Sequence, residues 1–309
     1  MEKKILLAVD HSIHSKHAVQ YAVMMSSVVK ELTYTLFNVQ PTISQFLLDE
    51  ATTDFKARAV LKSVIRKNAE SARALLEKYK AQMVRTGIAD KLIDVVTQPK
   101  LLGLAKDILD FAQQGLYDAI VVGRRGLSSV QKAFMGSVTA NLTSHCTIIP
   151  VWVADGDITS LKIMVAVDGS ESSLRAVDHL SFMIGENPEI KVTLFHVMPR
   201  LSDYCLIDFE DKEAGIEDII TQGNKRCIEH FYAHARQKFK EAGIQENQIE
   251  IKVTKRTVNV GKAIVDEAKK GKYGTVVVGR HGASGVSFIG SVSKYVLDKT
   301  LNRALWLVS

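Results

Sequence analysis

Short apolar runs rich in β-branched residues recur along the chain, and stretches with helical spacing separate them. In the first half, these runs predict strands over residues 4–9, 33–39, 91–96, 118–122 and 148–153. The runs are almost continuously apolar, which is typical of parallel strands that helices cover on both faces. The pattern therefore favours an α/β fold.

The segments between these strands carry the spacing of amphipathic helices. Helices are expected over residues 15–30, about 52–86, 102–113 and 137–145. The longest has an apolar stripe made of Val60, Val64, Ala72, Leu75, Leu76, Tyr79 and Met83. Gly87 follows it, and Gly243 has the same place in the second half, as candidates for the position just after a helix end. The alternation predicts a doubly wound parallel sheet with right-handed crossovers.

The second half of the chain repeats the first. Ile5–Asp10 matches Ile163–Asp168 and Thr35–Pro41 matches Thr193–Pro199, each at an offset of 158 residues. Two glycines further along recur at offsets of 156 and 154. Such a repeat indicates two copies of one domain, and we expect a first domain over residues 1–156 and a second over residues 157–309.

A glycine-rich segment follows the fourth predicted strand. Val121–Gly126 reads Val-Val-Gly-Arg-Arg-Gly, and Gly136-Ser137-Val138-Thr139 opens a predicted helix after nine intervening residues. Glycines let backbone N–H groups approach a bulky anion, and a helix N-terminus adds N–H groups with the helix dipole behind them. The segment is neither a P-loop nor a dinucleotide-binding G-x-G-x-x-G. Its spacing and repetition favour a phosphate site over a simple turn before a helix.

Three residues of the first copy lie at the carboxyl ends of predicted strands: Asp10, Val39 and Gly123. In a doubly wound sheet, ligands bind beyond the carboxyl ends of the strands at the topological switch point. The sequence therefore predicts that these three residues lie on one rim.

Composition narrows the class of protein. The net charge of +6 is spread over both halves without a basic run, which argues against a nucleic-acid or lipid partner. The three cysteines, Cys146, Cys205 and Cys227, form no C-x-x-C pair. They favour neither a disulfide framework nor a zinc knuckle, and Cys146 is expected as a small buried hydrophobe. No apolar stretch approaches the length of a membrane span, so we expect a cytoplasmic protein.

These motifs resemble the universal stress protein family, in tandem form and over essentially the whole chain. Gly123, Gly126, Gly136 and Ser137 match the G-x-x-G-x9-G-[S/T] pattern of its ATP-binding branch. The resemblance implies two Rossmann-like (adenine nucleotide alpha hydrolase-like) domains, each a five-stranded parallel sheet of order 3-2-1-4-5. It also implies that ATP or another adenine nucleotide binds the first domain, with magnesium, when present, near Asp10. The implied contact residues are Ala8, Val9, Asp10, Val39, Val122, Gly123, Arg125, Gly126, Gly136, Ser137, Val138 and Thr139.

The second copy departs from the pattern, because seven residues instead of nine separate Gly282 from Gly290. The shorter loop either reshapes the phosphate-binding site or leaves a segment that has only a structural role, and the sequence does not decide between these alternatives. Its candidate residues are Asp168, Val197, Gly279, Gly282, Gly290, Ser291 and Val292. The glycine with which the family often ends its third strand is absent from Thr97-Gln98-Pro99.

Asp10 has two compatible interpretations: a cap for the following helix, or a ligand for ribose or magnesium. Arg125, next to Gly126, is better placed than Arg124 to neutralise a phosphate, although both could be solvated surface arginines. His11, His14 and His17 invite a metal-site interpretation. No carboxylate or cysteine cluster stands nearby in sequence, so surface or partly buried histidines are favoured. His11 replaces a glycine beside the expected pocket and either touches or crowds the ligand.

These observations favour a non-enzymatic nucleotide-binding regulator of the stress response, because no nucleophile with a paired base and no P-loop lysine is found. The alternatives are a slow magnesium-dependent ATPase and an interaction module with degenerate pockets. In the family, domains pair through their fifth strands. The corresponding segments 148–153 and 304–308 would pair within one chain as a pseudo-dimer, and a homodimer of whole chains stays open.

Overall fold

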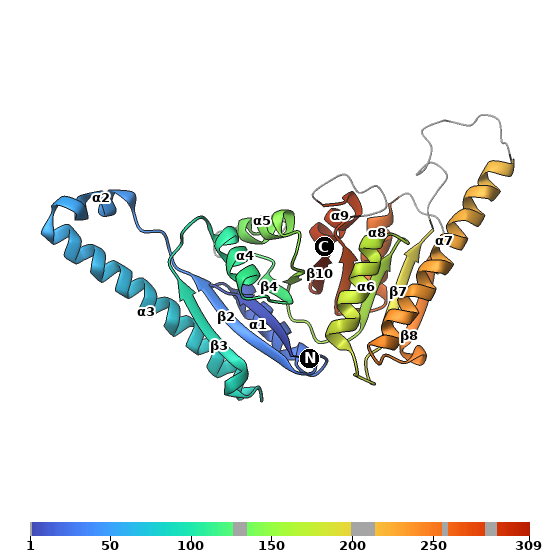
Figure 1. The fold of residues 1–309 in the computed structure, drawn as a ribbon, viewed down its shortest axis with the longest axis horizontal. Helices are drawn as coiled ribbons and strands as arrows, with labels where there is room; N and C mark the ends of the chain where they lie inside the picture. The colour runs from blue at the N-terminus through green and yellow to red at the C-terminus, as the bar shows by residue number, and fades with distance from the viewer. Residues whose placement is uncertain (1, 126–134, 199–213, 255–258, 282–288) are drawn as a thin grey trace. The chain divides into compact units, whose positions relative to one another are not determined.

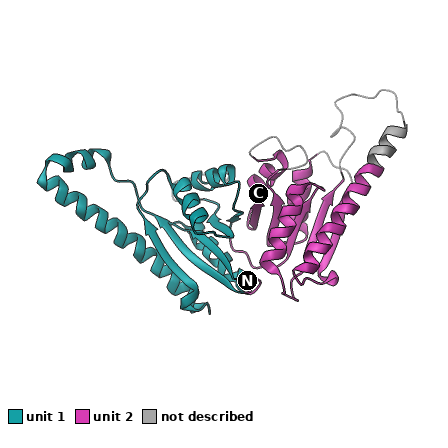
Figure 2. Ribbon diagram, in the orientation of Figure 1, with its two compact units in different colours: residues 1–26, 31–155 teal, residues 27–30, 156–309 magenta. Residues whose placement is uncertain are grey.

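The computed structural model describes residues 2–125, 135–198, 214–254, 259–281 and 289–309, with only the helix backbone over 214–221. The chain divides into two compact units. Unit 1 contains residues 1–26 and 31–155, and unit 2 contains residues 27–30 and 156–309 (Figure 2).

Unit 1 is built on a five-stranded parallel sheet (Figure 1). Its strands are β1 (Lys3–Ala8), β2 (Leu32–Val39), β3 (Ile93–Gln98), β4 (Ala119–Gly123) and β5 (Val151–Ala154). The order β3-β2-β1-β4-β5 confirms the predicted 3-2-1-4-5 sheet. Ala8 at the end of β1 pairs in register with Phe37 of β2 and Val122 of β4. The carboxyl ends of these central strands therefore form one rim.

Helices cover both faces of this sheet. They are α1 (Ile13–Met25), α2 (Gln45–Thr53), α3 (Phe55–Arg85), α4 (Leu104–Gln114) and α5 (Ser137–His145). Helices α1 and α3 contact each other, as do α4 and α5, so each pair shares one face of the sheet. A short 3-10 turn, η1 (Asp90–Leu92), precedes β3. Side chains of β1 such as Ile5, Leu6 and Leu7 are fully buried between the helical layers.

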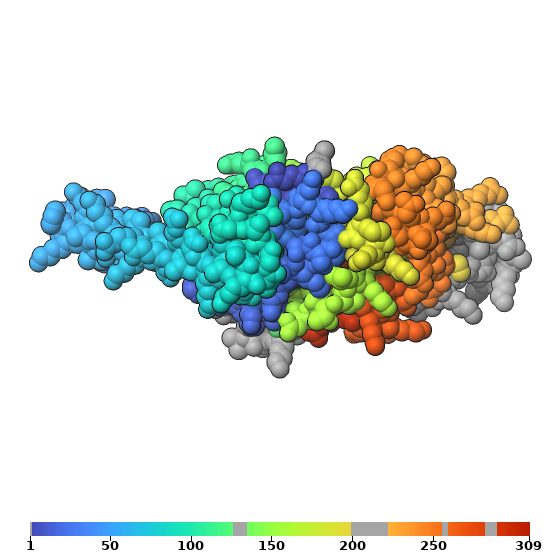
Figure 3. Space-filling view, turned by 90° about the horizontal axis from the view of Figure 1, so that it is seen from below, coloured from blue at the N-terminus to red at the C-terminus, as the bar shows by residue number. Residues whose placement is uncertain are grey.

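Helix α3 (Phe55–Arg85) corresponds to the helix expected over about 52–86, and α2 (Gln45–Thr53) precedes it as a further helix that the sequence did not predict. The side chain of Asp54 accepts the N–H groups of Lys56 and Ala57 and caps α3, so α2 ends just before it. Helix α2 and the first turns of α3 project from the rest of unit 1 (Figure 3). At its other end, α3 is followed by Gly87 with a φ of 103°, the left-handed conformation expected there.

Unit 2 repeats the design. Its strands are β6 (Ile163–Val167), β7 (Val192–Val197), β8 (Ile249–Thr254), β9 (Thr275–Gly279) and β10 (Ala304–Val308). All pair in parallel, and their order β8-β7-β6-β9-β10 is again 3-2-1-4-5. Helices α6 (Glu171–Ile184) and α7 (Ala214–Glu241) contact each other, as do α8 (Val260–Lys270) and α9 (Ser291–Lys299). The short η3 turn (Glu246–Gln248) precedes β8. None of the described helices has the length and apolar character needed to cross a bilayer.

Candidate nucleotide-binding site

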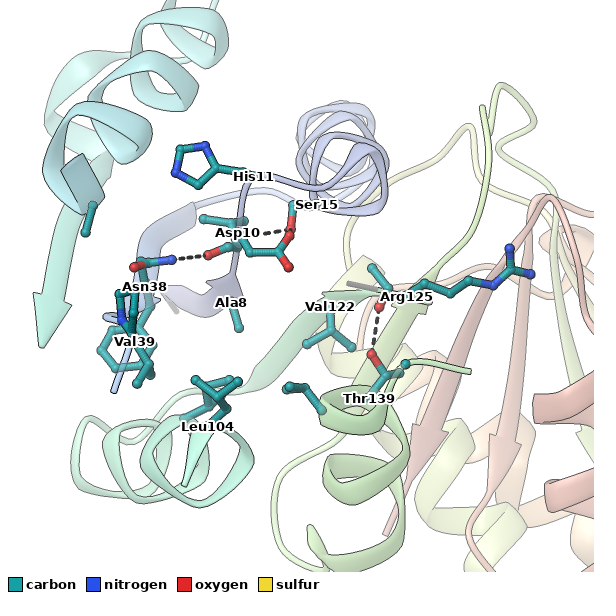
Figure 4. A pocket seen from close by; sticks show the side chains of 18 of the residues that line it. Ala8, Asp10, His11, Ser15, Asn38, Val39, Leu104, Val122, Arg125 and Thr139 are labelled. Carbon is teal, nitrogen blue, oxygen red and sulfur yellow. Dashed lines mark hydrogen bonds between the residues drawn. The ribbon is translucent and has the colours of Figure 1, made fainter. Parts of the chain in front are cut away.

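A pocket of about 370 Å³ lies at the carboxyl ends of β1, β2 and β4 in unit 1 (Figure 4). That volume is in the range of small-molecule sites. Eleven of the twelve candidate residues of the first domain line it: Ala8, Val9, Asp10, Val39, Val122, Gly123, Arg125, Gly136, Ser137, Val138 and Thr139. The twelfth, Gly126, lies outside the described residues. The fold thus gathers segments that are more than a hundred positions apart in the sequence.

Asp10 is fixed by the start of α1. Its Oδ1 accepts the N–H of Ser12 at 2.9 Å and the hydroxyl of Ser15 at 2.6 Å, and Ser15 Oγ in turn accepts the N–H of Asp10 at 2.8 Å. Ser12 is the N-cap of α1. The cap of α1 is thus Ser12 and not Asp10, whose carboxylate instead bonds the N–H of that cap residue and the hydroxyl of Ser15. The contact of Asp10 with ribose or magnesium stays a prediction.

Two side-chain hydrogen bonds hold the pocket walls (Figure 4). Asn38 of β2 donates through Nδ2 to the Val9 carbonyl at 2.7 Å. Thr139 of α5 donates through Oγ1 to the Gly123 carbonyl, also at 2.7 Å. The Gly136 N–H donates to the Arg124 carbonyl at 2.9 Å. These bonds tie the N-terminus of α5 to the end of β4, where first-turn N–H groups without an intrahelical acceptor border the pocket.

Unit 2 reproduces these bonds at its own rim. His196 Nδ1 bonds the Val167 carbonyl at 2.9 Å, and Ser293 Oγ donates to the Gly279 carbonyl at 2.6 Å. Gly290 N–H donates to the Arg280 carbonyl at 2.8 Å. The candidate residues Asp168, Val197 and Gly279 end or follow β6, β7 and β9, while Gly290, Ser291 and Val292 open α9. Gly282 lies outside the described residues.

Two family-model matches decide the identity of this architecture. The model of the Universal stress protein family matches residues 1–155 and again residues 160–300. The chain belongs to the universal stress protein family. The tandem arrangement inferred from the internal repeat is thereby confirmed.

Individual relatives agree with the family assignment. A universal stress protein of Mycolicibacterium smegmatis is 26% identical over 311 residues, which cover 96% of this chain and 93% of that protein. Universal stress protein Sll1388 of Synechocystis is 29% identical over 48% of this chain and 96% of its own length. The crystal structure of a universal stress protein from Archaeoglobus fulgidus has a TM-score of 0.67 at 19% identity, covering 99% of this chain and 98% of that one. This last likeness supports the fold.

In this member of the family, helix α3 supplies a pocket wall that the sequence prediction missed. Asn68, Ser71 and Ala72 line the pocket together with Leu104 and Ile108 of α4. A signal for Asn68 exists, because it falls four residues after Val64 and four before Ala72, on the apolar stripe of the predicted helix. A polar residue on an otherwise apolar stripe indicates that this part of the helix faces a polar group instead of the hydrophobic core.

The charged residues near the pocket differ in accessibility. Arg124 is only 2% exposed, whereas Arg125 lines the pocket. The guanidinium of Arg125 extends away from Ala8 and Leu104 (Figure 4).

His11 also lines the pocket. Burial lowers the pKa of His14, and the nearby Arg125 cation lowers it further. Among the described residues, no three His, Cys, Asp or Glu side chains gather as a metal site.

Proposed function

We propose that the chain binds an adenine nucleotide in the pocket of unit 1 and acts as a non-enzymatic regulator of the stress response. The observation that carries this proposal is the convergence of the glycine-loop residues, the α5 N-terminus and the ends of β1 and β2 on one pocket. An anion at a helix N-terminus is stabilised by free N–H groups and by the helix dipole.

The two ends of the pocket suit different parts of a nucleotide. The phosphates would lie against Gly136, Ser137 and Thr139 at the α5 N-terminus. Apolar side chains such as Ala8, Val39 and Leu104 line the remainder and would enclose the base. Asp10 is the only carboxylate among the described lining residues. It would accept hydrogen bonds from ribose hydroxyls or water.

Magnesium fits this donor set as a companion of the phosphates. Mg²⁺ is commonly held by one or two carboxylates together with substrate phosphates and water. Asp10 would be the protein carboxylate, with its Oδ1 already engaged by Ser12 and Ser15. The metal would neutralise phosphate charge there.

A non-enzymatic role is supported by the groups around the pocket. Its described lining contains no lysine, and two of its four hydroxyl-bearing residues, Ser15 and Thr139, are held by structural hydrogen bonds. Phosphoryl transfer relies on cations and a positioned nucleophile. We therefore expect nucleotide occupancy to act through conformation or partner contacts. Slow hydrolysis is tested by measuring phosphate release over hours against a no-protein control.

The binding test uses purified full-length chain. Mass spectrometry of the denatured protein should detect co-purified adenine nucleotide, and calorimetry with ATP and Mg²⁺ should give a saturable signal. Gly136→Asp places a carboxylate at the N-cap of α5, where aspartate is a favoured residue. The same charge repels phosphate by about 4 kcal/mol at ~4 Å and an effective dielectric constant of ~20. Affinity for ATP should fall by about a hundredfold or more.

The matched control is Gly290→Asp, the same change at the α9 N-cap of unit 2. It should leave the affinity of unit 1 for ATP unchanged. A protein without bound nucleotide that also gives no heat with ATP and Mg²⁺ would refute the proposal. Normal ATP binding by Gly136→Asp would show that the site is elsewhere.

A further inference from the structure

Helix α7 of unit 2 carries two histidines one turn apart. His230 and His234 are four positions apart, a spacing that puts both side chains on one side of a helix with their Cβ atoms about 5–6 Å from each other. Both residues are exposed, and their ring centroids are 4.3 Å apart. The helix therefore holds two imidazoles side by side at a surface that solvent reaches.

This pair is absent from the matching helix of unit 1. An offset of 156 residues aligns the buried residues of the two helices, which are Ala72, Leu75, Tyr79 and Met83 in α3 and Ile228, Phe231, Ala235 and Phe239 in α7. At this offset, His230 and His234 correspond to Ala74 and Lys78, which are also exposed. The buried side of the helix is thus apolar in both units, and its packing does not require the two histidines.

Two imidazoles in this arrangement can chelate a metal ion. Neutral imidazole nitrogen is a common ligand of Zn²⁺, Cu²⁺ and Ni²⁺, and two histidines four residues apart on one helix bind zinc in metalloproteases. The helix brings the side chains together before the ion arrives, so less conformational freedom is lost on binding. In the part of the chain that the structure describes, no group of three His, Cys, Asp or Glu side chains includes the pair. Water would fill the remaining coordination positions.

Two cations lie one turn away from the pair, and neither prevents a metal ion from binding. Lys238 follows His234 by four residues and donates to Asp178 Oδ1 of α6 at 2.5 Å, so a carboxylate offsets its charge. Arg226 precedes His230 by four residues and is exposed. Its guanidinium charge is therefore screened by water and salt.

We propose that His230 and His234 form a binding site for one divalent transition-metal ion per chain. Each imidazole supplies one nitrogen lone pair, and exchangeable water occupies the other coordination positions. Cu²⁺ should bind more tightly than Zn²⁺, as the usual stability order of divalent ions requires. The site does not depend on the function proposed for unit 1, because it lies on α7 of unit 2.

The test is calorimetric titration of the full chain with Zn²⁺ and Cu²⁺ at pH 7.5, where free imidazole is mostly neutral. His234→Gln should weaken binding about a hundredfold, because the second ligand of a chelate acts at a high effective concentration. The control is His17→Gln, which changes a histidine pair of α1 whose ring centroids are 5.9 Å apart and whose Nδ1 atoms are buried. It should leave the affinity unchanged. Equal affinity of the parent and His234→Gln, or one ion per two chains, would overturn the proposal.

Transfer of the pair to unit 1 tests whether the helical spacing is sufficient. The double variant Ala74→His, Lys78→His changes two exposed residues of α3 and should raise the binding stoichiometry from one ion per chain to two. Zn²⁺ stabilises the unit to which it binds. It should therefore raise the urea midpoint reported by Trp306 in the parent chain, and also that reported by Trp152 in the double variant. An unchanged stoichiometry in the double variant would contradict the geometric argument.

A last variant distinguishes two protein ligands from three. Cys227 lies three residues before His230, but its Sγ is beside Gly169, 3.2 Å from the place that a Cβ would take there. Cys227→Ser should therefore leave the affinity for Zn²⁺ unchanged. Electron paramagnetic resonance of the Cu²⁺ complex should show coupling to two imidazole nitrogens, and His234→Gln should remove one of them. A tenfold loss of affinity in Cys227→Ser would overturn the two-histidine site.

Discussion

Replacing Gly123 with alanine would force strand β4 and helix α1 apart. A Cβ built at this position lies 2.4 Å from the His14 carbonyl oxygen and 2.5 Å from its carbon. Optimal non-bonded separations are about 3.5–4.0 Å, so one element must move by about an ångström. The obstacle is backbone in the first turn of α1, which cannot rotate away. Overpacking costs about 1–3 kcal/mol, and we expect a loss near the upper end, about 3 kcal/mol.

Gly223→Ala is the matched control. It adds the same methyl group, but we expect it to raise the free energy of unfolding instead of lowering it. Gly223 is exposed within α7, and a Cβ there meets no atom within 4 Å. Alanine has the better helix propensity, by about 0.5–1 kcal/mol. This variant should therefore gain a little stability in unit 2, while Gly123→Ala loses stability in unit 1.

The two tryptophans of the chain allow each unit to be followed separately. Trp152 lies in β5 of unit 1 and Trp306 in β10 of unit 2, and both are fully buried. Urea unfolding of single-tryptophan backgrounds, Trp306→Phe and Trp152→Phe, reports one unit at a time. Gly123→Ala should lower the midpoint of the Trp152 transition. A free energy of unfolding within about 0.5 kcal/mol of the parent's, a spread typical of neutral surface changes, would refute the close-approach argument.

Two further outcomes follow from single side chains. Thr139→Val removes the hydroxyl that donates to the Gly123 carbonyl at 2.7 Å, and it should lower the unfolding free energy of unit 1 by about 1–2 kcal/mol in the Trp152 assay. The control, Thr143→Val, removes a hydroxyl that bonds carbonyls inside α5 and should lower it by less. Burial lowers the pKa of His179 to about 3. Because the unfolded chain then binds the proton more readily, the unfolding free energy of unit 2 should fall by up to about 1.4 kcal/mol per pH unit as the pH falls below about 6.5. His179→Tyr, which copies Tyr21 of unit 1, should flatten that dependence in the Trp306 assay.

The strands and the doubly wound parallel sheet could be predicted because that information lies in local patterns, whereas the strand order 3-2-1-4-5 came from the family resemblance. Each apolar run of the repeat became a parallel strand, and the switch point then placed Asp10, Val39 and Gly123 on one rim. Boundaries were predicted less well. The strand expected over 148–153 begins at Val151, since Pro150 has no N–H for a ladder, and Ile148 is 71% exposed.

The pocket wall on α3 was missed because a helical stripe identifies which residues face inward, not what they meet. Leu75 and Leu76 pack into the core, whereas Asn68, earlier on the same stripe, lines the pocket. Helix α2 was not predicted. Asp54, whose side chain accepts the N–H groups of Lys56 and Ala57, separates it from α3.

Residues that the two copies share and residues that differ have different physical roles. Gly123 and Gly279 are required because a Cβ would collide with the helix that follows β1 or β6. Thr139 and Ser293 keep a hydroxyl because a glycine carbonyl accepts it in both units. These requirements come from the fold and would persist in a domain that binds nothing. The exchange of Asn38 for His196 also keeps its backbone bond, but it leaves a different free atom at the rim. An internal repeat therefore identifies the scaffold by what is retained and points to ligand differences by what has changed.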